Sequence, residues 1–457
     1  MDKTRDKLVT YAANLNYADL TPGAIHAVKR SMVDSVGCAI GSFHSGTMKT
    51  VRGFASQYSS RRPATIIGTQ IKSSPELAAF ANGSMIRYSD FSDDYFGGNG
   101  DTGPHPSDNI GSLLAATEWI GGGGKSLVLG TVIAYEISGQ LIDHTTIRGN
   151  GWDHPTLHAI STSLGASKIL ELTTEQMGHA LGLAVVSNVC LFQTRLGGIS
   201  NWKGLAGPNA SRNGLFAALL AKEGITGPGE PFEGRNGFMK QLNNKFELGA
   251  FGGGKLPFKV EGTFFKHFPV VYQLGLPVSL ALELRKKVKI EDIDSICVFL
   301  QKKQVVLRSE HPEQWDPKTR ESADHSGPYV IGAAFVDGGI TEKTFTPERY
   351  RDPTILKLIE KIRFAEDPQY TAEYPRTFNC RFEVGLKSGE TITVHQKNPK
   401  GHPGNPMSDQ EIEAKFLKQV DEAIDKKQAR VLLDQLWELE KLDDVGKLFP
   451  LMRVRDH

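Results

Sequence analysis

The chain has 457 residues, of which 39 % are hydrophobic and 23 % are charged, and its formal net charge is +1. The balanced charge gives no reason to expect a nucleic-acid or membrane-surface partner. No stretch approaches the roughly 20 apolar residues that a membrane-spanning helix needs, and the length favours two domains over one.

The cysteines and the first residues of the chain indicate in which cellular compartment the protein is expected. The four cysteines lie far apart, without CxxC spacing, at Cys38, Cys190, Cys297 and Cys380. We interpret them as buried, reduced thiols rather than zinc or iron–sulfur ligands. The chain starts MDKTRDKLVTYAANL, which is charged and then amphipathic and lacks the apolar core of a signal peptide. The expected location is therefore cytoplasmic.

Helical patterns fill the first half of the chain. Thr21-Pro22-Gly23 and Pro75 are helix-start signals, and Thr173 is a predicted N-cap. Apolar residues recur at helical spacing in the segments 5–16, 22–42, 76–88, 109–120, 125–141, 154–170, 174–187 and up to about 223. This part is therefore predicted to be nearly all α-helical.

The stretch from Asp90 to Trp119 gathers residue types suited to proton transfer on an anion. It contains the acids Asp90, Asp93 and Asp94, a glycine-rich insert from Gly97 to Gly103, and the string HPSDN at 105–109. We expect Ser107 or Asp108 to cap the following helix, which would leave free backbone N–H groups beside His105. The combination predicts a site that binds an anion and moves a proton. A polar loop with an ordinary N-cap is the alternative.

Two later segments each place a basic residue beside a helix. His154 comes at the predicted start of the helix 154–170, where the helix dipole lowers a histidine's pKa and favours a nearby anion. Lys203 lies in a glycine-rich segment between apolar helices. Both are candidate site residues, and a solvated position is the alternative for each.

Beyond about residue 250 the pattern becomes mixed. Lys266 and His267 lie on a short aromatic segment just before a helix, and Ser408 is a predicted N-cap. Strands are predicted at 293–300, 377–385 and 391–395, the last two as a hairpin, and helices at 328–336, 355–362, 409–420 and 422–440. No GxGxxG string follows a predicted strand, so no nucleotide site is implied.

Several separated strings together resemble the MmgE/PrpD family. They are HPSDN at 105–109, NWKG at 201–204, FKHFP at 265–269, WDPKTRESADHSGPYV at 315–330 and GHP at 401–403. The family includes 2-methylcitrate dehydratases, cis-aconitate decarboxylases and iminodisuccinate epimerases. Asp94 stands where the family usually has threonine, a difference that bears on the substrate.

The resemblance implies a mainly α fold. A large all-α helical domain would be built from both termini, residues 1–260 and 405–457. A smaller α+β lid domain, residues 261–404, would interrupt it. The resemblance also implies a homodimer formed through the helical domain.

The same resemblance implies an active site without a metal or a cofactor. Its expected catalytic residues are Asp90, Asp94, His105, His154, Lys203 and Lys266. The histidines are the expected acid and base, in an order that stays open. The expected substrate contacts are Lys203, Lys266, His105 and Asp93. His325 is expected to pack the lid rather than to take part in catalysis.

The expected function is that of a cofactor-independent lyase on a small di- or tricarboxylate, with 2-methylcitrate dehydratase as the first choice. A cis-aconitate decarboxylase and an iminodisuccinate-type epimerase are alternatives on the same fold. The decarboxylase branch has a tyrosine after the first lid strand, where this chain reads FLQKK at 299–303. A carboxylate-binding protein without catalysis is the alternative from another class.

Glycines bracket the predicted lid at 249–254 and 401–404. Because glycine adopts many backbone conformations, we expect hinges there, and closure would carry Lys266 onto a substrate near His105 and Lys203. On this basis Lys266→Ala should lose far more activity than stability, which steady-state kinetics beside a thermal melt would show.

Overall fold

The computed structural model describes residues 1–97, 103–309 and 311–455. The protein is 57 % helical and 9 % strand, which confirms a mainly α fold with a small α+β part. Most of the insert predicted between Gly97 and Gly103 lies outside the described residues.

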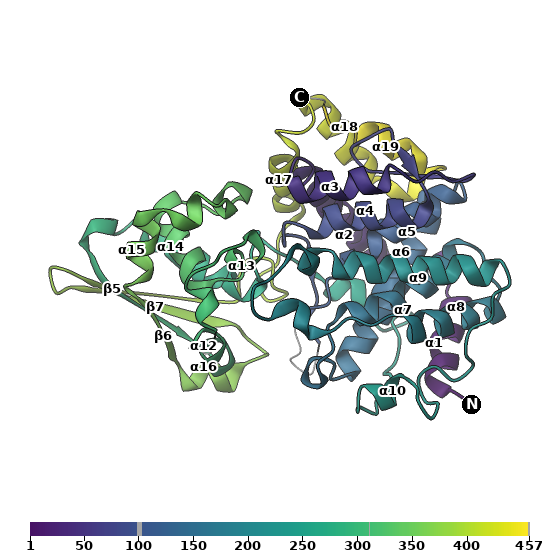
Figure 1. The fold of residues 1–457 in the computed structure, drawn as a ribbon, viewed down its shortest axis with the longest axis horizontal. Coiled ribbons are helices and arrows are strands. Elements are labelled where there is room, and N and C mark those ends of the chain that lie inside the picture. Colours follow the sequence, from purple (N-terminus) through teal and green to yellow (C-terminus); the bar gives the residue numbers. More distant parts are fainter. Residues whose placement is uncertain (98–102, 310, 456–457) are drawn as a thin grey trace.

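A large helical part contains both ends of the chain (Figure 1). Its first half holds α1 (Lys3–Asn14), α2 (Pro22–Gly41), α3 (Gly46–Ala55), α4 (Pro75–Arg87), α5 (Ile110–Trp119), α6 (Gly124–His144), α7 (Pro155–Ile169), α8 (Thr174–Ser187), α9 (Ala206–Lys222) and α10 (Phe238–Gln241). The chain returns to it with α17 (Asp409–Val420), α18 (Lys426–Trp437) and α19 (Leu448–Leu451). α17 packs against α2, so the two ends share one core.

The smaller part is built around a four-stranded sheet of order β6-β5-β7-β8. Its strands are β5 (Ile293–Leu300), β6 (Ile362–Glu366), β7 (Asn379–Leu386) and β8 (Thr391–Lys397). β5 and β6 are parallel, whereas β5–β7 and β7–β8 are antiparallel, which confirms the predicted hairpin. The helices of this part are α11 (Gly275–Leu284), α12 (Lys302–Ser309), α13 (Arg320–Ala323), α14 (Gly327–Asp337), α15 (Pro353–Ile359) and α16 (Pro368–Glu373).

Two separate apolar clusters correspond to these two parts. One unites residues from Leu8 to Phe265 with residues from Met407 to Val454, and the other covers Phe264 to Val394. The chain therefore passes between the two clusters near residues 265 and 400. The domain boundaries given above and the hinges stay predictions.

A short ladder joins the two parts beside the Asp90 stretch. β3 (Asp93–Asp94) pairs antiparallel with β4 (Phe264–Phe265), and each strand has only two residues. Since the ladder fixes β4 against β3, Lys266 is held next to the segment that carries Asp90. Two further strands of two residues each, β1 (Ala64–Thr65) and β2 (Lys72–Ser73), form a separate antiparallel ladder.

Most predicted elements are confirmed, and the differences have local causes. The predicted helix 355–362 ends at Ile359, because Ile362 enters the ladder with β5. The predicted helix 422–440 starts only at Lys426, where Asp425 accepts a hydrogen bond from the Gln428 backbone N–H. The short helices α3 and α12 were not predicted. The caps at Thr173 and Ser408 are confirmed as capping boxes.

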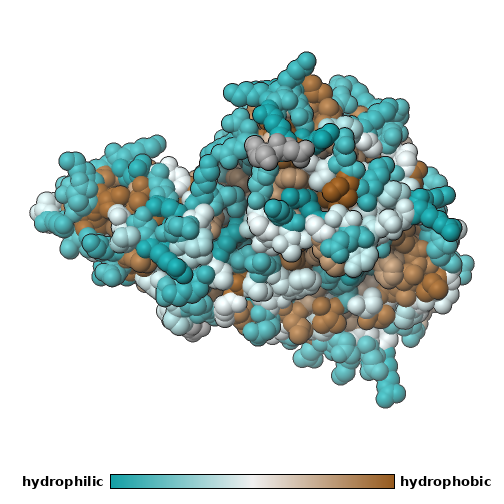
Figure 2. Space-filling model, turned by 45° about the horizontal axis from the view of Figure 1, so that its top comes forward, coloured by the Kyte–Doolittle hydropathy of each residue, from teal (hydrophilic) through white to brown (hydrophobic). Residues whose placement is uncertain are grey.

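The surface is mixed in polarity. On the face shown in Figure 2, hydrophilic side chains cover most of the surface and apolar ones gather in patches. Among the described residues, no helix combines the length and the hydrophobicity that crossing a membrane demands.

Gly401 lies in close contact with β4, in the segment where the chain returns to the helical part, and substituting it tests this contact. Its φ is +95°, and a Cβ there would lie 1.8 Å from the Phe265 carbonyl oxygen. Gly401→Ala should therefore lower the melting temperature, through strain and displacement of β4. Gly339→Ala is the control, because a Cβ at Gly339 meets nothing within 4 Å. Equal melting temperatures for the two variants would contradict this.

Candidate active site

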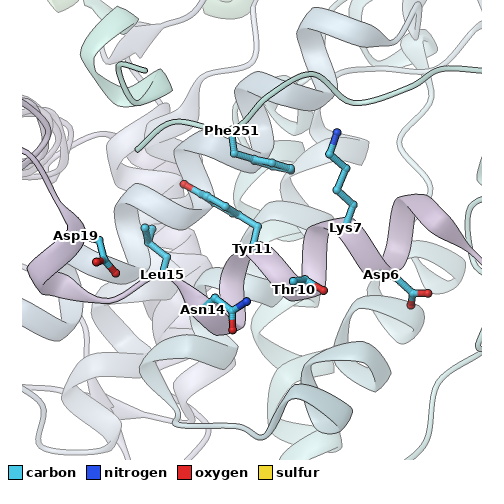
Figure 3. A pocket seen from close by; sticks show the side chains of 8 residues that line it. All are labelled: Asp6, Lys7, Thr10, Tyr11, Asn14, Leu15, Asp19 and Phe251. Atoms are coloured by element: carbon cyan, nitrogen blue, oxygen red, sulfur yellow. The ribbon is translucent and has the colours of Figure 1, made fainter. Parts of the chain in front are cut away.

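A cavity of about 660 Å³ lies at the junction of the two parts. The helical part contributes Arg87, Asp90, Asp94, His105 and His154 to its wall, and the smaller part contributes Lys266 and His325 among others. The chain elsewhere forms a hollow between α1 and Phe251 (Figure 3), where Tyr11 stacks on the Phe251 ring. The junction cavity brings histidines, lysines and acids together in one wall, and the hollow beside Phe251 contains no histidine among the described residues, so we take the junction cavity as the candidate site.

Asp90 lies at the centre of a cluster of buried cations. Its Oδ1 is 2.5 Å from Arg87 Nη1 and 2.9 Å from Lys266 Nζ, and its Oδ2 is 3.6 Å from Lys203 Nζ. All four side chains are at most 3 % exposed. Burial alone would raise the pKa of Asp90, but the three cations hold it well below its usual range. Asp90 is therefore an anion that neutralises part of a strongly positive site.

The backbone at Asp90 is unusual. Its φ is +51°, in the left-handed region that few non-glycine residues adopt. The turn follows α4 directly, so that Arg87 in the last helical turn and Asp90 pair across three residues. A strained conformation at a buried charged residue is typical of a functional site.

Lys266 is bound to Asp90 by two contacts, because its Nζ also donates to the Asp90 carbonyl oxygen at 3.1 Å. A solvated position for Lys266 is therefore ruled out. Because Lys266→Ala would break a buried ion pair, we expect it to cost stability as well; that it loses far more activity than stability stays a prediction.

His105 faces the same carboxylate with a free nitrogen. Its Nδ1 is 2.7 Å from the Asp93 carbonyl oxygen and its Nε2 is 4.0 Å from Asp90 Oδ1. Since a carbonyl oxygen can only accept, Nδ1 carries the proton and Nε2 keeps a lone pair. Burial and then the Arg87 and Lys266 cations lower the pKa of His105 well below its ordinary value. A neutral imidazole with an available Nε2 can act as a base.

The predicted cap of the following helix is wrong. His105 precedes a 3-10 turn, Pro106–Asn109, and neither Ser107 nor Asp108 makes a side-chain cap bond. The Ser107 backbone N–H instead donates to Asp93 Oδ1 at 3.0 Å, and Tyr135 Oη donates to Asp93 Oδ2 at 2.8 Å. The Asp93 carboxylate thus accepts the hydrogen bond from the Ser107 backbone N–H that we expected to be available to an anionic substrate. Asp93 positions His105 and does not line the cavity, so a direct substrate contact by Asp93 is not supported.

Asp94 lines the cavity as a buried acid. Its Oδ1 accepts from the Tyr95 backbone N–H at 2.9 Å, and its side chain is buried. Burial raises the pKa of Asp94 to about 7, although Lys266 opposes the shift. Near neutral pH a large fraction of Asp94 is therefore protonated and can donate a hydrogen bond, as a threonine hydroxyl would.

His154 begins α7 as predicted and is almost fully covered. Arg148 Nη2 lies 3.2 Å from its Nδ1 and Asp153 Oδ1 lies 3.1 Å from the same atom, while Arg195 Nε pairs with Asp153 Oδ2 at 2.7 Å. Burial lowers the pKa of His154 well below its usual value. Its ring centroid is 5.6 Å from that of His105, so the two imidazoles are neighbours.

Lys203 connects Asp90 to an acid of the smaller part. Its Nζ lies 3.2 Å from Asp324 Oδ2, and Arg320 Nη1 lies 3.0 Å from the same oxygen. His325 Nδ1 forms a very short contact with the other oxygen, Asp324 Oδ1. Burial lowers the pKa of Lys203 despite these carboxylates.

Sequence reasoning missed Arg87, Asp324, Arg148 and Arg195. Arg87 had a usable signal, because it precedes Asp90 by three residues at the end of a predicted helix. Asp324 lies in a string that we noted only for its resemblance. Arg148 and Arg195 lie far apart in sequence and meet only around His154 and Asp153 in the folded chain.

Metal binding was not expected from sequence spacing, yet two trios gather ligand atoms within 4.8 Å of one another. They are Asp108 with His154 and His158, and Asp90 with Asp324 and His325. In the second trio, Lys203 pairs with both carboxylates. In the first, Arg87 Nε lies 3.9 Å from Asp108 Oδ1. A dication in either place would lie beside a fixed cation, so we assign neither as a metal site.

Comparisons with known proteins find matches to the two domains of one family over most of the chain. The MmgE/PrpD N-terminal domain matches residues 6–250 and the MmgE/PrpD C-terminal domain matches residues 268–439. The cis-aconitate decarboxylase of Homo sapiens is 26 % identical, over 98 % of this chain and 94 % of that protein. The 2-methylcitrate dehydratase of Salmonella typhimurium is 24 % identical, over 85 % and 84 %. The alkylcitrate dehydratase phiI of a fungal species is 27 % identical, over 91 % and 87 %.

The buried charge of Asp90 should be essential for stability. Asp90→Asn would leave Arg87 and Lys266 without their shared anion, so we expect a loss of about 3–5 kcal/mol in the free energy of unfolding. Denaturant unfolding at pH 7 measures it, with the exposed Asp294→Asn as control. A loss below about 0.5 kcal/mol, the usual range for surface changes, would show that the cluster does not depend on this anion.

Proposed function

This chain belongs to the MmgE/PrpD family, and on that premise we propose that it is a cofactor-independent lyase acting on a small di- or tricarboxylate. The reaction we favour is dehydration of 2-methylcitrate to 2-methyl-cis-aconitate. The observation that carries the proposal is that Arg87 and Lys266 line one cavity beside the neutral imidazole of His105, while Lys203, which does not line the cavity, pairs with the same Asp90.

The cation cluster supports binding of more than one carboxylate. Arg87 and Lys266 share Asp90, and each has N–H donors beyond those that Asp90 uses: an ammonium has three and a guanidinium five. Arg148 also lines the cavity, next to His154. Because water is largely excluded there, each cation–carboxylate contact is stronger than on the surface. A substrate carboxylate can therefore bind beside Asp90 without displacing it.

Proton abstraction is assigned to His105. Dehydration of a citrate-type substrate removes a proton from a carbon next to a carboxylate, which requires a base within reach. His105 Nε2 has its lone pair on the cavity side, and the Asp93 carbonyl fixes the ring's tautomer. Lys266 and Arg87, which line the cavity, would stabilise the negative charge that develops on the neighbouring carboxylate as the C–H bond breaks.

The alternatives on the same fold differ in what the site must do. A decarboxylase must release carbon dioxide and protonate carbon, and an epimerase needs acid and base on opposite faces of one carbon. The segment after β5, where the decarboxylase branch is expected to have a tyrosine, contributes Lys303 and Gln304 to the cavity. This favours dehydration. The identities of 24–27 % do not separate the named activities.

A cytoplasmic homodimer formed through the helical part completes the proposal. In support of such an interface, Val186, Val189 and Leu191 near the end of α8 each expose more than half of their surface. Exposed apolar side chains that lie close together often mark a protein interface.

A substrate panel tests the reaction class. Purified protein with EDTA present should convert 2-methylcitrate, or citrate more slowly, to an unsaturated tricarboxylate detected by ultraviolet absorbance. The panel also contains cis-aconitate and iminodisuccinate. Conversion of cis-aconitate with release of carbon dioxide would replace dehydration by decarboxylation. Tight binding without any turnover, seen by calorimetry, would favour the non-catalytic alternative.

Asp94 predicts how substrate binding depends on pH. Above its pKa of about 7, Asp94 gains a negative charge that repels a substrate carboxylate, so the KM of the wild type should rise from pH 7 to pH 9. Asp94→Thr keeps a hydroxyl donor but cannot ionise, so its KM should stay nearly constant over this range. A parallel rise of KM in both proteins would contradict the role of Asp94.

The same substitution has a consequence for stability. An acid whose pKa is raised on folding holds its proton more tightly in the folded state, so the contribution of Asp94 to stability falls as pH rises from about 4 to about 7. The melting temperature of the wild type, measured relative to that of Asp94→Thr, should therefore fall over this range; the pKa of Asp93 is also raised, to about 6, but both proteins contain Asp93, so its contribution largely cancels in the difference. Thermal melts across pH 4–8 measure the slope.

A further inference from the structure

His325 is more accessible than His105 and His154, which line the same cavity. Its side chain is 22 % exposed, against 7 % for His105 and 1 % for His154. It lines the cavity from the smaller part, and its Nε2 is 4.0 Å from Asp90 Oδ2. His105 Nε2 is 4.0 Å from the other oxygen, Asp90 Oδ1. The two imidazoles therefore approach the same carboxylate from the two parts of the chain.

The backbone around His325 is fixed on both sides. α13 ends just before Asp324 and α14 begins at Gly327, with Ser326 accepting a hydrogen bond from the Tyr329 N–H. The Val271 N–H donates to the Asp324 carbonyl oxygen at 3.1 Å. α13 lies where the smaller part meets the helical part (Figure 1). A residue held this firmly is preorganised rather than merely exposed.

The orientation of the His325 ring is set by a buried acid. Asp324 is fully buried and accepts from His325 Nδ1, while Lys203 and Arg320 fix the Asp324 carboxylate. Since this carboxylate is ionised beside two cations, Nδ1 must donate, which leaves Nε2 directed toward the cavity. A carboxylate at Nδ1 also stabilises the imidazolium form, as in hydrolytic triads.

His105 and His325 differ in the charge of their hydrogen-bond partners, although both lie 4.0 Å from an Asp90 oxygen. The hydrogen-bond partner of His105 is a neutral carbonyl, and the cations Arg87 and Lys266 face it. His325 is bonded to one carboxylate and approaches a second, with Lys203 as the opposing charge. Burial and Lys203 lower the pKa of His325, and Asp324 and Asp90 oppose them. Between two such groups, the one paired with carboxylates is the one more readily protonated before the step, and so the one able to serve as the acid.

We propose that His325 is a catalytic residue that protonates the leaving hydroxyl of the substrate. This inference rests on the proposed dehydration. His105 Nε2 takes the C–H proton and the C–H electron pair becomes the new C=C bond. The C–O bond breaks with its electron pair, and the proton on His325 Nε2 goes to that oxygen, so that water leaves. The bound polycarboxylate, which brings further negative charge, favours the protonated His325 before the step.

A structural role for His325, packing the smaller part against the helical part, is the competing explanation. Two features of the position favour catalysis. A packing residue would bury its ring, whereas the His325 ring keeps one edge in the cavity. Asp324 also has Lys203 and Arg320 as ion-pair partners, so its charge is compensated without His325. The two roles predict different kinetics.

His325→Asn tests the proposal against His395→Asn. His395 is a control because it is an exposed histidine of the same part, on β8, and does not line the cavity. We expect His325→Asn to lower kcat by about 10²–10⁴-fold, with KM changed less than about threefold. The alkaline limb of the kcat profile should also disappear. His395→Asn should keep wild-type kcat and its pH profile. A kcat for His325→Asn within threefold of wild type, or a retained alkaline limb, would overturn the proposal.

His325→Ala with added imidazole separates proton transfer from folding. If the variant melts like the wild type, free imidazole should restore part of its kcat, because the vacated space opens on the cavity. No rescue in a folded variant would overturn the proposal. If His325→Ala does not fold, the His325→Asn kinetics decide alone.

An NMR measurement of ligand binding, which needs no turnover, tests this inference separately from the proposed function. In protein labelled with ¹⁵N-histidine, citrate should shift the Nε2 resonance that His325→Asn removes. If no panel substrate reacts but citrate shifts this resonance, the dehydratase proposal fails and His325 still contacts the carboxylate ligand. If citrate binds and the resonance stays unchanged, His325 does not touch the ligand and the inference fails, whatever the activity.

Discussion

The buried carboxylate of Asp90 is the constraint on which the site depends. It neutralises part of the charge of Arg87, Lys203 and Lys266, three cations that could not otherwise be buried together in a low-dielectric environment. Lys203 also pairs with Asp324, and Arg87 Nε lies 3.9 Å from Asp108, so the cavity-lining Lys266 is the cation that we expect to contribute most to binding an anionic substrate. The strained φ of +51° at Asp90 fits a position held by its surroundings rather than by local preference.

The same cluster explains why the two parts of the chain meet where they do. Lys266 reaches Asp90 because β4 pairs with β3, and Lys203 reaches Asp324 across the junction. The histidines follow from these contacts. Asp93 is fixed by the Ser107 N–H and Tyr135, and its carbonyl orients His105. Asp324 orients His325 from the other side. The catalytic geometry is thus assembled by ion pairs and hydrogen bonds between segments distant in sequence.

The fold class could be predicted from the sequence because periodicity and caps are local. Thr173 and Ser408 act as caps as predicted, and the β7–β8 hairpin follows from its turn. The end of α15 could not be predicted, because pairing of Ile362 with β5 is a tertiary contact. In the site, the strings around His105, Lys203 and Lys266 led to residues that do meet in space. What Asp93 does could not be predicted, because its partners Ser107 and Tyr135 become neighbours only on folding. His325 was interpreted as packing for the same reason, since its partners Asp90 and Lys203 lie more than 100 residues away.

The central claim is that the cations around Asp90 bind substrate carboxylates between His105 and His325. A crystal structure with propane-1,2,3-tricarboxylate, which lacks the hydroxyl group and so cannot be dehydrated, tests it most directly. The account predicts carboxylate oxygens about 3 Å from Lys266 Nζ and from the Arg87 guanidinium, which both line the cavity, and a ligand carbon facing His105 Nε2. A ligand bound elsewhere, with Lys266 and Arg87 contacting only protein groups such as Asp90, would contradict it.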